Sequence, residues 1–126
     1  MAIQKSTRNG SVTKDGACIQ YQWALLANGD TGDWVSAAEW SGKTFQVSGT
    51  FGAGGSVSIQ GSNDLNPTNA AILSNWQGTA LTATAAGFLT ARDMPIWVRP
   101  IVTAGDGTTS ILVTLAAHRA DIAEIG

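Results

Sequence analysis

The 126-residue sequence is poor in charge: Asp, Glu, Lys and Arg make up 13% of it, and the formal net charge is -2. That is about half the charged fraction of an ordinary soluble domain, which argues against a coiled coil, a long helical bundle and a charge-rich disordered chain. A slightly acidic chain also lacks the broadly basic surface with which proteins bind nucleic acid. We therefore expect no nucleic-acid partner.

Cysteine and histidine occur once each, as Cys18 and His118. One cysteine cannot form an intramolecular disulfide, and the apolar neighbours Ala17 and Ile19 favour a buried small side chain over a reactive thiol. A Ser-His-Asp or Cys-His catalytic set would have to use His118, which follows the last expected strand and is expected to face solvent. The same counts exclude a zinc site made of cysteine and histidine. We expect no enzymatic activity, no metal and no cofactor.

Long hydrophobic runs are missing too. No window approaches the roughly 18 consecutive apolar residues of a membrane-spanning helix. The segment Met1–Lys14 is polar and has no apolar stretch of the kind found in secretory signals. We expect no membrane partner.

The sequence is instead rich in glycine, with 15 residues, and in short segments where apolar and polar residues alternate. Such segments, separated by glycine, asparagine and aspartate, are typical of β-strands joined by turns. Without a long amphipathic helix between them, they predict an all-β fold, an antiparallel β-sandwich or jelly roll. We expect the main strands at 19–26, 44–51, 56–60, 88–89, 96–103 and 110–117.

Two glycine-rich turns are predicted to close β-hairpins. The turn at 52–55 joins the second expected strand to the third, and the turn at 105–107 joins the last two. Pro100 lacks the N–H that a β-ladder uses and is expected at a sheet edge or a bulge. The segments 34–40 and 70–76 could each hold a helical turn.

Basic residues are concentrated near the N-terminus, where residues 1–16 contain Lys5, Arg8 and Lys14, whereas the remainder is acidic. This segment is predicted to be an extended arm, either a frayed terminus or a segment that becomes ordered on a partner surface. The expected organisation is an N-terminal arm at 1–16, a sandwich domain at 17–118 and a C-terminal tail at 119–126.

The loop Asn28–Asp33, followed by Glu39, partly matches the ligand spacing of a calcium-binding loop. Asp33 stands where that loop requires glycine, and Gly32 stands where it requires an oxygen ligand. We expect a plain loop.

Five tryptophans are the unusual feature of the composition. Large aromatic side chains serve as core residues, as platforms for sugar rings or as anchors at interfaces. We expect Trp23 and Trp97 in the core. Trp34, Trp40 and Trp76 lie in or beside loops, which makes them candidates for contact with another subunit or a ligand.

Three strand-and-turn segments, Val47–Gly52, Val57–Asp64 and Ile96–Val102, precede a closing Gly105–Gly107 turn. In this arrangement the chain resembles the small jelly-roll cement or decoration proteins of tailed bacteriophages. The resemblance implies a structural virion protein that is made in the host cytoplasm and stabilises the head from its outer surface. It also implies two partners: the major capsid protein of the same virus, and further copies of the chain in a homotrimer.

On this basis Lys5, Arg8 and Lys14 are expected to contact the capsid. Trp34, Trp40 and Trp76 are expected at subunit or shell interfaces. The segments 60–64 and 97–99 are also similar to the discoidin-type galactose-binding jelly roll. The alternative function is therefore a carbohydrate-binding module on a phage tail or fibre.

Overall fold

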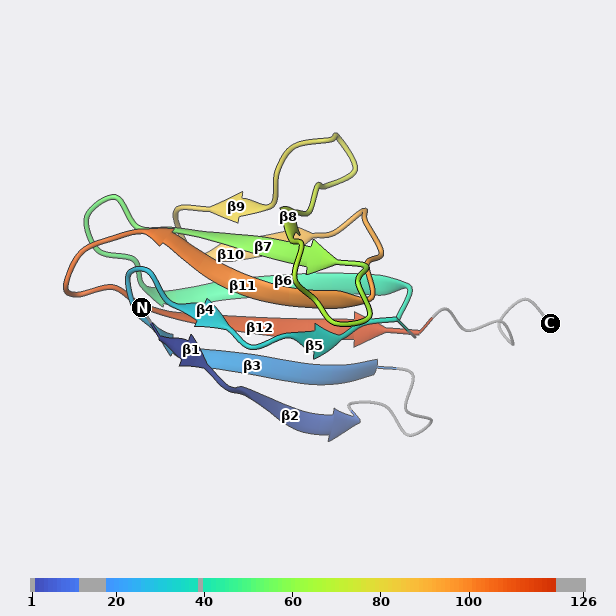
Figure 1. The fold of residues 1–126 in the computed structure, drawn as a ribbon. Helices are drawn as coiled ribbons and strands as arrows, with labels where there is room; N and C mark the ends of the chain where they lie inside the picture. Colours follow the sequence, from blue (N-terminus) through green and yellow to red (C-terminus); the bar gives the residue numbers. More distant parts are fainter. Residues whose placement is uncertain (1, 12–17, 39, 120–126) are drawn as a thin grey trace.

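The computed structural model describes residues 2–11, 18–38 and 40–119. Their regular structure consists of β-strands, which form two stacked sheets (Figure 1). The expected all-β, mainly antiparallel sandwich is confirmed. Within the described ranges there is no helix long and apolar enough to cross a membrane.

Sheet A is centred on β11 (Trp97–Ala104) and β7 (Ser56–Ser62), which pair antiparallel along most of their length. Short strands complete it on both sides, and one pair of them, β1 with β4, is parallel. They are β1 (Ile3–Gln4), β4 (Thr31–Gly32), β5 (Val35–Ser36), β8 (Ala71–Ile72) and β9 (Thr82–Ala83).

Sheet B has five strands in the order β10, β6, β12, β3, β2. Its three long central strands carry most of the alternating apolar residues that the sequence analysis identified. The bounds are β10 (Gly87–Thr90), β6 (Gly42–Thr50), β12 (Ser110–His118), β3 (Cys18–Leu26) and β2 (Ser6–Ser11).

The hydrophobic core lies between the sheets. In β12 every second residue faces inward, so Ile111, Val113 and Leu115 are at most 1% exposed. Val57 and Ile59 of β7 face them from sheet A and are equally buried. The period of two in the sequence therefore gave the inward-facing residues correctly.

Both predicted hairpins are wrong. β6 and β7 belong to different sheets, as do β11 and β12, so loops 51–55 and 105–109 carry the chain across the sandwich (left in Figure 1). Alternation shows that one face of a strand is buried, but it does not show whether the next strand pairs beside it or packs opposite it.

The N-terminal segment is part of both sheets as far as it is described. β1 pairs with β4 in sheet A, and β2 pairs with β3 in sheet B. Residues 3–11 therefore contain paired strands instead of the expected extended arm. Backbone hydrogen bonds hold this segment, and its polar sequence lacks the apolar alternation from which strands are predicted. Residues 12–16 of the expected arm, and 120–126 of the expected tail, lie outside the described residues.

The expected helical turns are also replaced by strands, since 34–40 contains β5 and 70–76 contains β8. Pro100 lies inside sheet A rather than at its edge. On one side it is opposite Ile59 of β7, and on the other it falls between the pairings of Val98 with β5 and of Ile101 with β4. The interruption between β4 and β5 is where a residue without an N–H fits.

Candidate functional site

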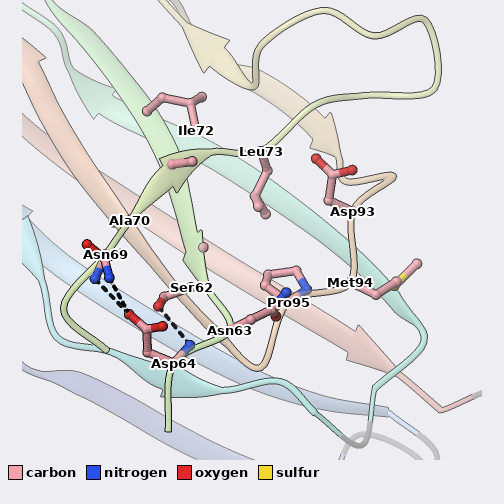
Figure 2. A pocket seen from close by; sticks show the side chains of 12 residues that line it. Ser62, Asn63, Asp64, Asn69, Ala70, Ile72, Leu73, Asp93, Met94 and Pro95 are labelled. Atoms are coloured by element: carbon pink, nitrogen blue, oxygen red, sulfur yellow. Dashed lines mark hydrogen bonds between the residues drawn. The ribbon is translucent and has the colours of Figure 1, made fainter. Parts of the chain in front are cut away.

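A surface hollow of about 550 Å³ lies beside the end of β7 (Figure 2). One wall is the loop that follows Ser62, and the other is the segment from Asp93 to Pro95. Leu73 and Ile72 supply apolar surface between them. Gly61 at its base has no room for a side chain, because a Cβ there would lie 2.5 Å from Pro95 and 2.6 Å from Leu73.

The polar groups of this hollow serve to shape its loops. Asp64 Oδ2 accepts hydrogen bonds from the backbone N–H and the side-chain amide of Asn69, at 3.0 and 3.1 Å, and from Thr68 at 3.2 Å. The Asn69 backbone N–H is the main cause that lowers the pKa of Asp64 below its usual value. Asn63 Oδ1 accepts from the N–H of Ile96 at 3.0 Å. A carboxylate stabilised in its ionised form in this way is poorly suited to act as a general acid.

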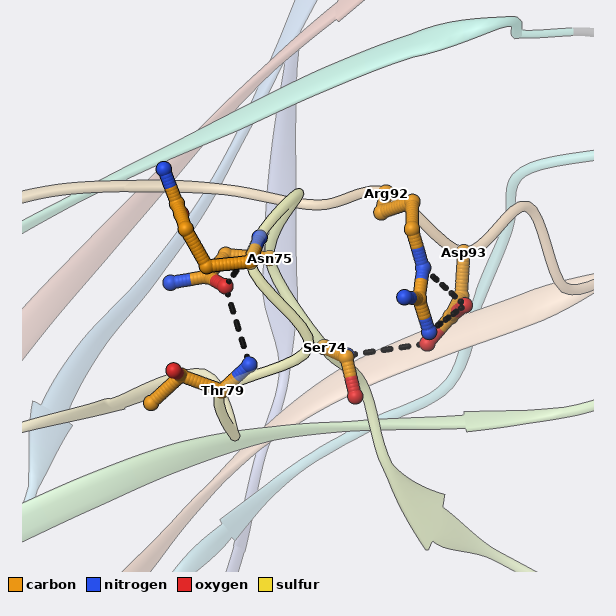
Figure 3. Close-up of polar contacts among 6 residues, drawn as sticks. Ser74, Asn75, Thr79, Arg92 and Asp93 are labelled. Carbon is orange, nitrogen blue, oxygen red and sulfur yellow. Dashed lines mark hydrogen bonds and ion pairs between the residues drawn. The ribbon is translucent and has the colours of Figure 1, made fainter.

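A second hollow, about 360 Å³, lies between the turn at 75–79 and strand β10. Asn75 organises the turn: its Oδ1 accepts hydrogen bonds from the N–H groups of Gln77 at 2.9 Å and Thr79 at 3.0 Å (Figure 3). Asn75 N–H donates to Thr79 O at 2.8 Å, and Gly78 supplies the positive φ of 81° that the turn requires. The turn is therefore held in a single conformation from within.

The turn is also fastened to the neighbouring segment. Ser74 N–H donates to Asp93 Oδ2 at 2.9 Å (Figure 3), and Arg92 N–H donates to Ser74 O at 2.8 Å. The Asp93 carboxylate additionally pairs with the Arg92 guanidinium at 3.3 Å. These contacts hold the backbone of the turn that carries Trp76 at its tip.

Two large aromatic side chains border this second hollow with most of their surface in solvent. Trp76 is 67% exposed and Phe88, on β10, is 69% exposed. Both are far from the usual burial of such side chains.

On the outer face of sheet A, Arg99 stacks on Trp34 with its guanidinium carbon 4.2 Å from the ring centroid. Arg99 Nε donates to Gln60 Oε1 at 2.9 Å. Partial burial lowers the pKa of Arg99 without removing its charge. The sequence signal for this contact is the alternation in β11, which puts Arg99 on the face opposite Val98.

Lys43 is 1% exposed, although it belongs to a residue type that is almost never fully buried unpaired. Its Nζ donates to Trp40 O at 2.8 Å and contacts Met94 Sδ at 3.3 Å. Within the described part of the chain no carboxylate lies within ion-pair distance of it. Desolvation lowers the pKa of Lys43.

Asp30 lies in the loop whose spacing partly matched a calcium site, and its carboxylate accepts hydrogen bonds from neighbouring segments. Burial alone would raise its pKa, but hydrogen bonds from the Ala27 N–H, the Gln4 side chain and the Ala2 N–H outweigh burial and lower it. In the described ranges no three Asp, Glu, His or Cys side chains are grouped to hold a metal ion.

Cys18 is buried as expected, and His118 is exposed as expected. They are register partners in β3 and β12, with His118 Nε2 4.0 Å from Cys18 Sγ.

Of the three residues expected to contact the capsid, the structure describes two. Lys5 lies exposed between β1 and β2, and Arg8 is exposed on β2. Lys14 lies outside the described residues.

The three tryptophans expected at interfaces do not share one surface type. Trp34 is half-buried under Arg99, and Trp76 is exposed on its turn. Trp40 was expected at an interface, but it is 3% exposed and belongs to the core, because it lies between β5 of sheet A and β6 of sheet B, where the chain passes from one sheet to the other. Trp97 was expected in the core, but it is half-buried on the outward side of β11, where its Nε1 donates to Asp64 O at 2.9 Å.

Phe88 is the site residue that the sequence analysis missed. It was expected to anchor a strand together with Leu89, and β10 does form there. In a strand two adjacent residues point to opposite faces, so one of this pair had to be outward. The alternation rule therefore contained the signal, but it did not say which residue would face solvent.

No family model matches the sequence. No curated protein matches it either. Among solved structures, the fold is similar to the SPBc2 prophage-derived protein YomS, with a TM-score of 0.59 at 11% identity over 79% of this chain and 93% of that one. A weaker likeness, TM-score 0.46 at 14% identity, is to hydroxypropylphosphonic acid epoxidase from S. wedmorenis, covering 90% of this chain and 50% of the enzyme. The likeness to YomS shows a common fold.

Proposed function

We propose that this chain is a structural protein of a tailed-phage particle, a cement or decoration protein on the outer surface of the head. The observation that carries the proposal is the fold shared with a prophage-derived protein along 93% of that protein's length. The chain would stabilise the shell by bridging neighbouring subunits of the major capsid protein.

The construction of the sandwich supports this role. A cement protein has to transmit force between the subunits it bridges without unfolding. Loops 51–55 and 105–109 are tied to each other at one end of the sandwich, where Thr109 Oγ1 donates to Phe51 O at 2.8 Å and Asp106 accepts from Ala53. Such cross-links between the two sheets resist sliding of one layer over the other.

The surface proposed for the capsid is the outer edge of sheet B. This sheet ends at β2, and no other described strand pairs with the outer side of β2. An open edge can accept a strand or loop of another chain through backbone hydrogen bonds. Lys5 and Arg8 add positive charge there, and Lys14 belongs to the same proposed contact by its place in the sequence.

The mechanism is additive. Each copy contributes a modest contact area, but many copies on one shell bind cooperatively with the assembled lattice, because only the assembled form presents adjacent sites. We include self-association as a homotrimer in the proposal, with Trp34 and the Arg99 stacked on it as the surface available for subunit or shell contact.

The test is co-sedimentation with capsids assembled from the major capsid protein of the phage genome that encodes this chain. The native chain should sediment with the capsids, and the double variant Lys5→Glu/Arg8→Glu should bind at least about tenfold more weakly, because it reverses the charge at the β2 edge. Ala85→Glu/Ala86→Glu is the control, because these exposed residues precede β10, at the opposite edge of sheet B, and this variant should bind like the native chain. Failure of the folded native chain to bind at saturating concentration would reject the cement function.

A further inference from the structure

We propose that the hollow between the 75–79 turn and β10 is a binding site for a neutral saccharide. The site combines the exposed rings of Trp76 and Phe88 with amide and hydroxyl groups, in a depression of about 360 Å³. Ligand sites of small molecules begin at about this size. The proposal does not depend on whether the chain is located on the head or on another part of a particle.

The aromatic rings supply the apolar half of the site. A pyranose ring presents a face of C–H groups, which packs against an indole or phenyl ring much as other apolar groups do. Trp76 and Phe88 come from different elements, a turn and an edge strand, and both line the hollow. Leu81, buried beneath them, forms part of the same wall.

The polar half consists of groups that have no partner within the described residues. Asn75 Nδ2, the Gln77 side-chain amide, Thr90 Oγ1 and Trp76 Nε1 make no hydrogen bond there. Sugar hydroxyl groups both donate and accept, so they match amides and hydroxyls equally well. The fixed backbone of the turn lowers the entropy cost of binding, since Asn75 already holds the N–H groups of Gln77 and Thr79.

The absence of charge among the residues lining the hollow selects the ligand class. No Asp, Glu, Lys, Arg or His is among these described lining residues. An anionic sugar such as a sialic acid would place its carboxylate among these uncharged residues, and Arg92, beside Gly78 of the turn, is already paired with Asp93. A protein partner that packs an apolar side chain into the hollow is also less favoured. It would leave the Asn75 and Gln77 amides and Thr90 Oγ1 without hydrogen-bond partners.

The affinity for one sugar residue should be weak, with a Kd of about 1 mM, because the ligand is small. Binding is therefore measured with the full chain biotinylated and displayed on streptavidin, applied to a glycan array that holds neutral, sialylated and sulfated glycans. We expect a defined set of neutral glycans to bind. Trp76→Ala and Phe88→Ala should each reduce that signal at least about tenfold.

Leu65→Ala is the matched control, since Leu65 is an exposed hydrophobic residue at 89% that does not line this hollow. It should bind glycans like the native chain. Because all three side chains are exposed, unchanged melting temperatures are expected and serve to show that each variant folds. In solution, the bound sugar should protect Trp76, the most exposed tryptophan, from quenching by acrylamide.

Three results would overturn the proposal. The first is a blank array with folded, multivalent protein. The second is binding that Trp76→Ala and Phe88→Ala leave unchanged. The third is binding confined to anionic glycans. A blank array accompanied by loss of self-association or capsid binding in the two aromatic variants would assign the hollow to a protein partner.

Discussion

The Asp106 carboxylate accepts a hydrogen bond from the backbone N–H of Ala53 at 2.8 Å, across 53 residues of sequence. Its other oxygen accepts from the N–H and the hydroxyl of Thr108, at 2.9 and 2.6 Å. One side chain thus joins two of the loops that carry the chain from one sheet to the other. Polar contacts therefore help to close the sandwich at this end, beside Phe51, which packs against the core.

Asp106→Asn is expected to lower stability at neutral pH, because an amide cannot accept all the hydrogen bonds that the carboxylate accepts. Hydrogen bonds lower the pKa of Asp106 from 3.8 to about 2. The largest effect comes from the Thr108 hydroxyl and the next from the Ala53 N–H. A pKa lower in the folded state means that the unfolded chain binds the proton more tightly. The contribution of Asp106 is therefore complete above about pH 4 and disappears as the pH falls through about 2.

Urea unfolding of the native chain and of Asp106→Asn measures this difference at a series of pH values. The two midpoints should be well separated near neutral pH and should converge between about pH 4 and pH 2. A constant separation across that range would show that ionisation of Asp106 does not stabilise the loops.

Lys43→Met is expected to raise the free energy of unfolding at neutral pH, by on the order of 1 kcal/mol. Methionine has a similar unbranched chain but removes a charge that is 1% exposed. Because desolvation lowers the pKa of Lys43 below 10.5, the native protein becomes more stable as the pH rises toward that value. The advantage of the variant should therefore shrink in alkaline solution.

Lys5→Met is the matched control for this experiment, since Lys5 is exposed, and it should change stability little. Denaturant unfolding at neutral and alkaline pH gives both comparisons. A Lys43→Met protein less stable than the native one would mean that the hydrogen bond to Trp40 O outweighs the cost of burying the charge.

Gly49→Ala is expected to destabilise the protein far more than Gly54→Ala, although both glycines have positive φ, 102° and 68°. A Cβ at Gly49 would lie 2.5 Å from Ser110 O in the adjacent strand β12, whereas a Cβ at Gly54 has nothing within 4 Å. Gly54→Ala should cost about 1 kcal/mol of backbone strain, and Gly49→Ala about 2–4 kcal/mol. Equal melting temperatures for the two variants would contradict the close pairing of β6 with β12.

Arg99→Met and Trp34→Leu are expected to be coupled. A cation 4.2 Å from a ring centroid at a half-exposed site contributes about 0.5–1 kcal/mol. A double-mutant cycle from chemical unfolding should return a coupling energy of that size. The cycle separates this stacking from the hydrogen bond that Arg99 donates to Gln60. A second cycle that combines Arg99→Met with Trp76→Leu should give a coupling near zero, and similar values in both cycles would remove the evidence for stacking.

The sequence allowed the class of fold and the inward faces of the long strands to be predicted, because the period of two in Ile111, Val113 and Leu115 reflects burial directly. It did not allow the pairing of strands to be predicted. Burial of Val47 is satisfied equally by a neighbouring strand or by the opposite sheet, and the choice is made by loop contacts such as Asp106 with Ala53.

The candidate sites were harder to predict for a related reason. Position in a loop suggested that both Trp40 and Trp76 were exposed, but Trp40 is in the core and Trp76 is at the tip of a turn. The difference depends on where the chain goes after each tryptophan, which is a property of the whole fold. The edge strand β2 escaped notice because backbone pairing leaves no mark on a polar sequence such as that of Ser6–Ser11.

The most direct test of the proposed role is the location and number of this chain in purified particles of a tailed phage whose genome is found to carry this sequence. Immunogold labelling with an antibody to the chain, combined with quantitative mass spectrometry, measures both. The cement function predicts gold on the outer surface of heads and a copy number that is a large fraction of the number of major capsid subunits. Label confined to tails or fibres, or absence of the chain from the particles, would contradict it.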